Sequence, residues 1–87
     1  MCTYITEPLE ISGSAKGPRG WQPVVRAHVS FDHPQHAPLD HALEIDLIDP
    51  SGGRVAIELT AASARALVAA IGRALERGEA ETGEAGV

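Results

Sequence analysis

Apolar and polar residues alternate along four short segments of the chain, which is the pattern of strands that bury one face. These segments are residues 4–11, 24–31, 43–48 and 54–59. In the third, Leu43, Ile45 and Leu47 fall on one face, and Glu44 and Asp46 fall on the other. Stretches rich in Gly, Pro, Ser and Asp separate the segments and favour turns. We therefore expect four strands joined by loops.

The first strand is expected at an edge of the sheet or with a bulge, because Pro8 has no N–H to donate to a neighbouring strand. Residues 12–20 are rich in Gly, Ser and Pro, and we expect them to form a loop. The predicted inward face comprises Ile5, Leu9, Ile11, Val25, Ala27, Val29, Phe31, Leu43, Ile45, Leu47, Val55, Ile57 and Leu59. The predicted outward face carries Arg26, His28, Glu44, Asp46 and Glu58.

The spacing of apolar residues changes to that of a helix after Thr60, which is a good N-cap residue. The helix is expected to run to Arg77 and to end before Gly78. Its apolar stripe consists of Ala64, Leu67, Val68, Ile71 and Leu75. Residues 79–87 are acidic and contain Gly, and we expect a disordered tail there.

The predicted fold is therefore α+β: a four-stranded antiparallel sheet in the order ββββα, with one C-terminal helix packed on one face. Residues 1–78 are expected to form a single domain. Only 3% of the residues are aromatic, so its core depends on small aliphatic side chains. A small chain with so thin a core often gains stability from a second subunit, a metal or a ligand. We expect a homodimer that forms through the outer sheet face or an edge strand.

The net charge is −5, and the seven basic residues are spread singly along the chain. This distribution disfavours nucleic-acid and anionic-membrane partners, which require clustered basic residues. No leader segment and no long apolar run is visible, so we expect no membrane span. A single cysteine cannot form an internal disulfide. These features favour a cytoplasmic protein.

The segment 32–41 contains three of the four histidines, and the sole cysteine is Cys2. If the first two strands pair directly with Ile11 opposite Val24, Cys2 lies opposite His33. Thiolate and imidazole are preferred ligands of Zn²⁺, and of Fe²⁺ or Cu as alternatives. The predicted ligands are Cys2, His33, His36 and His41, with Asp32 and Asp40 as hydrogen-bond partners of the imidazoles. Four ligands would suit a structural ion, and three with an open position would suit a reactive one.

Two other interpretations remain open. The histidines can simply shape a loop, in which case the protein is a non-catalytic dimeric interaction module without metal. The Cys2 thiolate can also serve as a nucleophile in a metal-free enzyme. If the protein is an enzyme or an accessory protein, its ligand is expected to be a small metabolite, which the sequence does not identify. The outward pair Glu44 and Asp46 suits a solvated face better than acid–base catalysis.

Three segments carry a family resemblance. They are the opening Met1-Cys2-Thr3-Tyr4-Ile5-Thr6, the segment Lys16-Gly17-Pro18-Arg19-Gly20-Trp21, and the segment from Phe31 to Leu43 that contains Asp-His-Pro-Gln-His-Ala-Pro. In these the chain resembles a family of short actinobacterial proteins of unknown function, over roughly residues 1–77. The resemblance implies that the Cys2 opening and the histidine segment are parts of one family sequence pattern. It implies no established activity.

Overall fold

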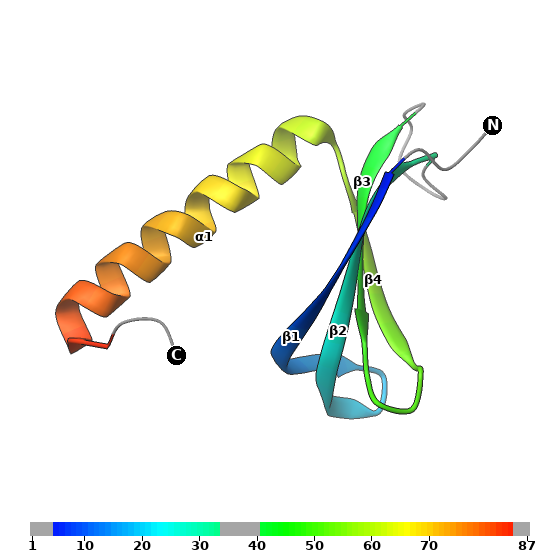
Figure 1. The fold of residues 1–87 in the computed structure, drawn as a ribbon, viewed down its shortest axis with the longest axis horizontal. Coiled ribbons are helices and arrows are strands. Elements are labelled where there is room, and N and C mark those ends of the chain that lie inside the picture. Colours follow the sequence, from blue (N-terminus) through cyan, green and yellow to red (C-terminus); the bar gives the residue numbers. More distant parts are fainter. Residues whose placement is uncertain (1–4, 34–40, 85–87) are drawn as a thin grey trace.

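The structure, a computed structural model, describes residues 5–33 and 41–84. Its elements are β1 (Ile5–Gly17), β2 (Gly20–Asp32), β3 (Ala42–Ile48), β4 (Arg54–Leu59) and α1 (Ala61–Thr82). The strands form one antiparallel sheet in the order β1-β2-β3-β4, and the helix follows (Figure 1). This arrangement confirms the predicted α+β class and the direct pairing of the first two strands.

The β1–β2 hairpin is longer than predicted. The expected loop 12–20 is wrong, because the strands continue to Gly17 and Gly20 and leave only Pro18 and Arg19 in the turn. Ala15 is buried, so cross-strand pairing and burial override the weak strand propensity of this Gly-rich stretch. Gly20 has a φ of 94°, which glycine adopts without strain.

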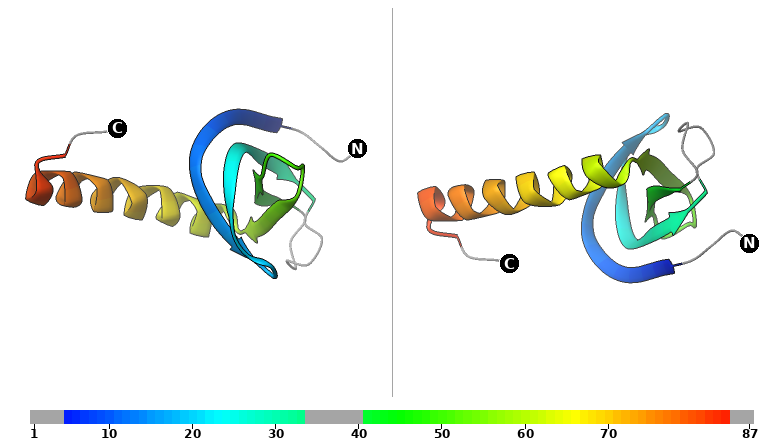
Figure 2. Two further views of the ribbon diagram at one scale, coloured as in Figure 1. Left: turned by 90° about the horizontal axis from the view of Figure 1, so that it is seen from below. Right: turned by 90° about the horizontal axis from the view of Figure 1, so that it is seen from above.

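A bulge in β1 changes the predicted register. The regular pairing is interrupted between Glu10 and Gly13, and Val24 lies opposite Gly13 rather than Ile11. Pro8 pairs regularly with His28, on an edge strand as expected, so the bulge is not at the proline. Bulges bend a strand and increase its twist. Figure 2 shows β1 curving strongly around the rest of the sheet.

The core of the described residues consists of small side chains. Only Ala15, Val24, Ala27 and Ala42 among them are buried. Most of the other apolar residues of β3 and β4 are half-buried. Five residues predicted to face inward are more exposed than that: Ile5 at 55%, Leu9 at 46%, Val25 and Ile57 at 43% each, and Phe31 at 37%. The apolar face of the sheet is therefore only partly covered.

The helix begins as predicted and ends later. Thr60 Oγ1 accepts a hydrogen bond from the Ser63 backbone N–H at 3.0 Å, which confirms the N-cap. The helix continues to Thr82 and ends at Gly83, which has a φ of 75°. The predicted end at Arg77 and the predicted start of a disordered tail at residue 79 are therefore wrong. A single Gly78 costs about 1 kcal/mol of helix stability relative to Ala, and the good helix formers that follow continue the helix.

Helix α1 contacts β3 and β4 near its start and then extends away from the sheet (Figure 1). None of its residues is buried. The molecule is consequently elongated, with extents of 47 × 31 × 21 Å. Within the described part of the chain, no helix combines the length and the apolar character that crossing a membrane requires.

Candidate functional site

Two of the predicted metal ligands lie side by side at one end of the sheet. β2 ends with Asp32 opposite Ala42, the first residue of β3, so His33 and His41 occupy the next position of the same pairing. Their ring centroids are 4.8 Å apart and their planes differ by 25°. A metal-bound nitrogen lies about 2 Å from its ion and donates in the plane of its ring, so these stacked rings are close enough to share one ion once one of them rotates out of the stack.

The His41 ring also stacks on Phe31, with centroids 5.3 Å apart and an angle of 7° between the planes. His41 is half-buried, whereas His33 is exposed. Stacking on an aromatic ring restricts the orientation of His41 and leaves its ring nitrogens at the edge of the stack. The sequence prediction did not include this role of Phe31, although alternation along β2 places Phe31 and His33 on one face.

The other predicted ligands lie outside the described residues. These are Cys2 and His36, together with the predicted imidazole partner Asp40. The start of β1 does neighbour the end of β2, because Ile5 pairs with Phe31. Among residues 5–33 and 41–84, no three His, Cys, Asp or Glu side chains are grouped as metal ligands would be. The complete four-ligand set therefore stays a prediction.

Asp32 fixes the backbone at this end of the sheet. Its Oδ1 accepts a hydrogen bond from the His33 backbone N–H at 2.7 Å. The predicted role of Asp32 was instead to accept a hydrogen bond from an imidazole. The observed hydrogen bond restrains the backbone where the chain leaves β2, and it therefore helps to position His33.

The outer sheet face forms a hollow of about 220 Å³ that His33 and four carboxylates line. The carboxylates are Asp32, Glu44, Asp46 and Glu58. Asp46 forms an ion pair with Arg54 at 3.1 Å, in which the arginine side chain is exposed and the aspartate side chain is half-buried. Glu44 and Glu58 lie directly opposite each other on neighbouring strands.

Desolvation raises the pKa of Glu44, and its hydrogen bond with Glu58 and repulsion from Asp32, Glu58 and Asp46 raise it further. A raised carboxyl pKa means that the folded state binds the proton more tightly than the unfolded state does. The contribution of Glu44 to stability is thus present below the ordinary pKa of 4.5 and is lost as pH rises through the folded-state pKa.

We therefore expect Glu44→Gln to stabilise the protein at pH 7, by roughly 0.2–1 kcal/mol, since it removes like-charge repulsion across the strand pair. The gain should disappear near pH 4, where the carboxyl groups are largely protonated. Urea unfolding at both pH values measures it. A variant that is less stable than the wild type at pH 7 would show that the Glu44 charge is favourable in this hollow.

The chain matches a family of unknown function, DUF6295, over residues 1–85. It belongs to this family. Comparison with curated proteins and with solved structures finds no significant match. The match to DUF6295 confirms the resemblance to a family of unknown function that the motifs indicated. It also extends over the histidine segment and the Cys2 opening.

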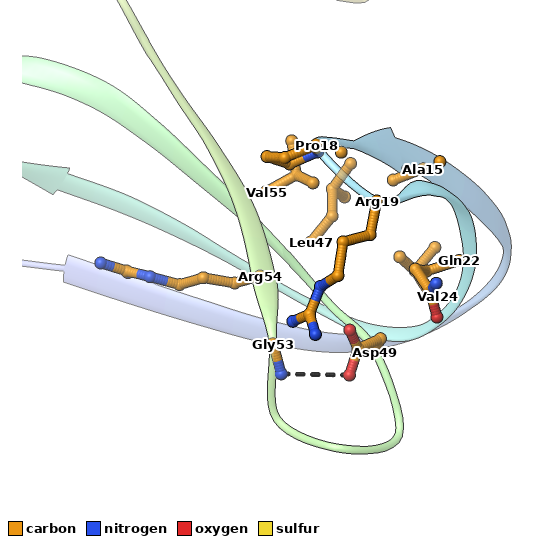
Figure 3. Close-up of a pocket in the computed structure, with 12 residues that line it drawn as sticks. Ala15, Pro18, Arg19, Gln22, Val24, Leu47, Asp49, Gly53, Arg54 and Val55 are labelled. Atoms are coloured by element: carbon orange, nitrogen blue, oxygen red, sulfur yellow. Dashed lines mark hydrogen bonds between the residues drawn. The ribbon is translucent and has the colours of Figure 1, made fainter.

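A second, smaller hollow of about 100 Å³ lies between the two tight turns at the opposite end of the sheet (Figure 3). Asp49 Oδ1 organises the β3–β4 turn by accepting hydrogen bonds from the Ser51 backbone, the Ser51 hydroxyl and the Gly53 backbone. The hydrogen bonds from Ser51 are the main reason that the pKa of Asp49 is lowered. In this DUF6295 member the Asp49 side chain therefore stabilises the β3–β4 turn. The hollow forms where this turn lies next to the β1–β2 turn.

In this family member an apolar groove of about 390 Å³ lies between the sheet and α1. The sheet side of the groove comprises Val29, Phe31, Leu43, Ile45 and Leu59. Its helix side comprises Ala61, Ala64, Arg65, Leu67, Val68 and Ile71. The sequence predicted both sides as apolar faces, but it predicted that they close on each other. The open groove is the feature that sequence reasoning missed.

Proposed function

We propose that this chain is a small cytoplasmic metal-binding protein whose ion is held where β2 ends and β3 begins. The proposed ligands are His33, His41, His36 and the Cys2 thiolate. The observation that supports the proposal is the placement of the His33 and His41 rings 4.8 Å apart. The neighbouring position of β1, whose first described residue pairs with Phe31, supports a contribution from Cys2.

The donor set suits Zn²⁺ first, with Fe²⁺ or Cu as alternatives, because it combines imidazole nitrogens with one thiolate. The imidazoles bind as neutral rings and the cysteine as a thiolate, so binding releases protons and weakens in acid. If all four groups bind, the ion is structural. If only three of these groups bind and the fourth coordination position stays open, the ion can polarise a small metabolite or activate water. Asp32 and Asp40 would then orient the ligand rings.

The metal content of untagged protein, produced with ample Zn²⁺, Fe²⁺ and Cu, tests this proposal. We expect a stoichiometric metal in the wild type and a loss of most of it in Cys2→Ala, His33→Ala, His36→Ala and His41→Ala. His28→Ala is the matched control, because His28 lies in mid-strand opposite Pro8 and Asp46 and is not a proposed ligand. It should retain the metal.

Two results would contradict the proposal. One is wild-type protein without stoichiometric metal after purification under these conditions. The other is equal metal loss in His28→Ala and in the four ligand variants, because that pattern indicates adventitious binding to surface histidines. Circular dichroism of each variant shows whether a loss of metal accompanies a loss of fold.

The second candidate function is a non-catalytic homodimeric interaction module, and the open apolar groove favours it. Metal content separates the two functions, since a module without metal gives none in any variant. Dimerisation is compatible with both. Sedimentation of the wild type at several concentrations tests for the dimer, and a mass near the single-chain 9.1 kDa at all of them would contradict it.

A further inference from the structure

The single chain exposes more surface than a folded protein of its mass. Its accessible area is 6706 Å², whereas a folded monomer of 9.1 kDa is expected to expose about 4,900 Å². Its radius of gyration is 14.7 Å, compared with about 12 Å for a compact domain of 87 residues. Each chain therefore has an excess of about 1,800 Å² of surface by this scaling.

Exposed apolar residues of α1 and half-buried apolar residues of the sheet face the same groove. On α1, Leu67, Val68, Ile71 and Leu75 form one stripe and are 40%, 71%, 51% and 57% exposed. On the sheet, the apolar residues around Ile45 line the opposite wall of the groove. The groove is lined by helix residues as far as Ile71, and the rest of α1 extends away from the sheet (Figure 1).

We infer that a second copy of this chain covers the groove, with the apolar stripe of each α1 packed on the apolar sheet face of its partner. This inference rests on the proposed homodimer and names its surface, which is the inner face rather than the outer face or an edge strand. Both surfaces are present in every chain. In a dimer with a two-fold axis, the helix stripe of each chain can therefore pack on the sheet face of the other.

The area supports this occupant. Obligate homodimers bury about 2,000–5,000 Å² in total, or about 1,000–2,500 Å² on each chain. The excess of about 1,800 Å² per chain falls within this range. An interface of this kind resembles a domain core cut in half. That fits a chain whose own described core holds only one valine and three alanines.

A charged substitution at Val68 tests the inferred surface. In the isolated chain Val68 is 71% exposed, so Val68→Glu should leave a free monomer unaffected. In the inferred dimer the carboxylate would be buried against the partner's sheet. The matched control is Ala66→Glu, which adds the same charge to the same helix about 160° away around its axis.

The experiment is sedimentation equilibrium of the wild type and both variants, with circular dichroism for folding. We expect wild type and Ala66→Glu to be folded dimers, and Val68→Glu to associate at least about 100-fold more weakly or to unfold at the same concentration. Either behaviour of Val68→Glu supports the inference, because nothing in the single chain covers this residue enough to cause it.

Two outcomes would overturn the inference and are distinguishable from each other. If Val68→Glu and Ala66→Glu dimerise as the wild type does, the dimer stands but its surface lies elsewhere. If the wild type is monomeric at every concentration, the homodimer fails with it, and the groove belongs to a different occupant. Neither outcome depends on the metal content, so the metal proposal is tested separately.

Discussion

Replacing Ala27 with aspartate is expected to destabilise the protein by about 3 kcal/mol or more, which is enough to unfold a small domain. Ala27 is only 4% exposed and lies opposite Leu9 on one side and Leu47 on the other. A carboxylate at this position would lose its hydration and gain no partner among those leucine side chains. Thermal unfolding followed by circular dichroism measures the effect.

Gln22→Asp is the control for this substitution, because it adds the same charge to the same strand at an exposed position. Its melting temperature should stay within a few degrees of the wild type, consistent with the small effects of most surface substitutions. If Ala27→Asp melts as Gln22→Asp does, the pairing of β2 between β1 and β3 is wrong.

Truncation of Ile45 to alanine is expected to cost about 2–4 kcal/mol of unfolding free energy. Ile45 lies on an inner strand between Val29 and Ile57, and it also lines the groove beneath α1. Removing three carbons leaves a void that the rigid sheet cannot close fully. Ile45→Val removes only one carbon and should cost about 0.5–1.5 kcal/mol.

Urea unfolding of both variants measures these costs. We expect Ile45→Ala to lose more unfolding free energy than Ile45→Val. The graded loss is expected only if Ile45 is covered in the assembled protein. A midpoint for Ile45→Ala that equals the wild-type midpoint would mean that this side of the sheet is solvated. The assignment of the apolar face would then be wrong.

The sequence predicted the parts of the fold that local pattern determines. Alternation identified all four strands, and Thr60 marked the start of the helix because an N-cap hydroxyl satisfies a specific backbone N–H. The turn between the third and fourth strands was visible from its run of Asp, Pro, Ser and Gly residues, and the structure adds that Asp49 accepts hydrogen bonds from the Ser51 and Gly53 backbone N–H groups.

Other features depend on contacts that local pattern does not encode. The Gly-rich segment after Glu10 forms strand because Ala15 is buried and a two-residue turn connects it to β2. The helix passes Gly78 because its stop signal is weak within a long run of good helix formers. The separation of α1 from the sheet also follows from tertiary packing, since an apolar stripe predicts that a partner exists but not which chain supplies it.

The candidate metal site was predicted in part for a geometric reason. The pairing of β2 with β3 brings His33 and His41 together, and this pairing follows from the strand boundaries. The predicted Cys2 position depended on the β1–β2 register, which the bulge before Gly13 shifts. The sequence indicated only that the two chain segments meet at the same end of the sheet.

A crystal structure of untagged, metal-replete protein, with anomalous data on both sides of the zinc absorption edge, is the most direct test of the proposed site. We expect an anomalous peak about 2 Å from a ring nitrogen of His33 and of His41, with the Cys2 sulfur about 2.3 Å from it. The contradicting result is the absence of a peak at those rings, with the Cys2 sulfur packed among apolar side chains away from them.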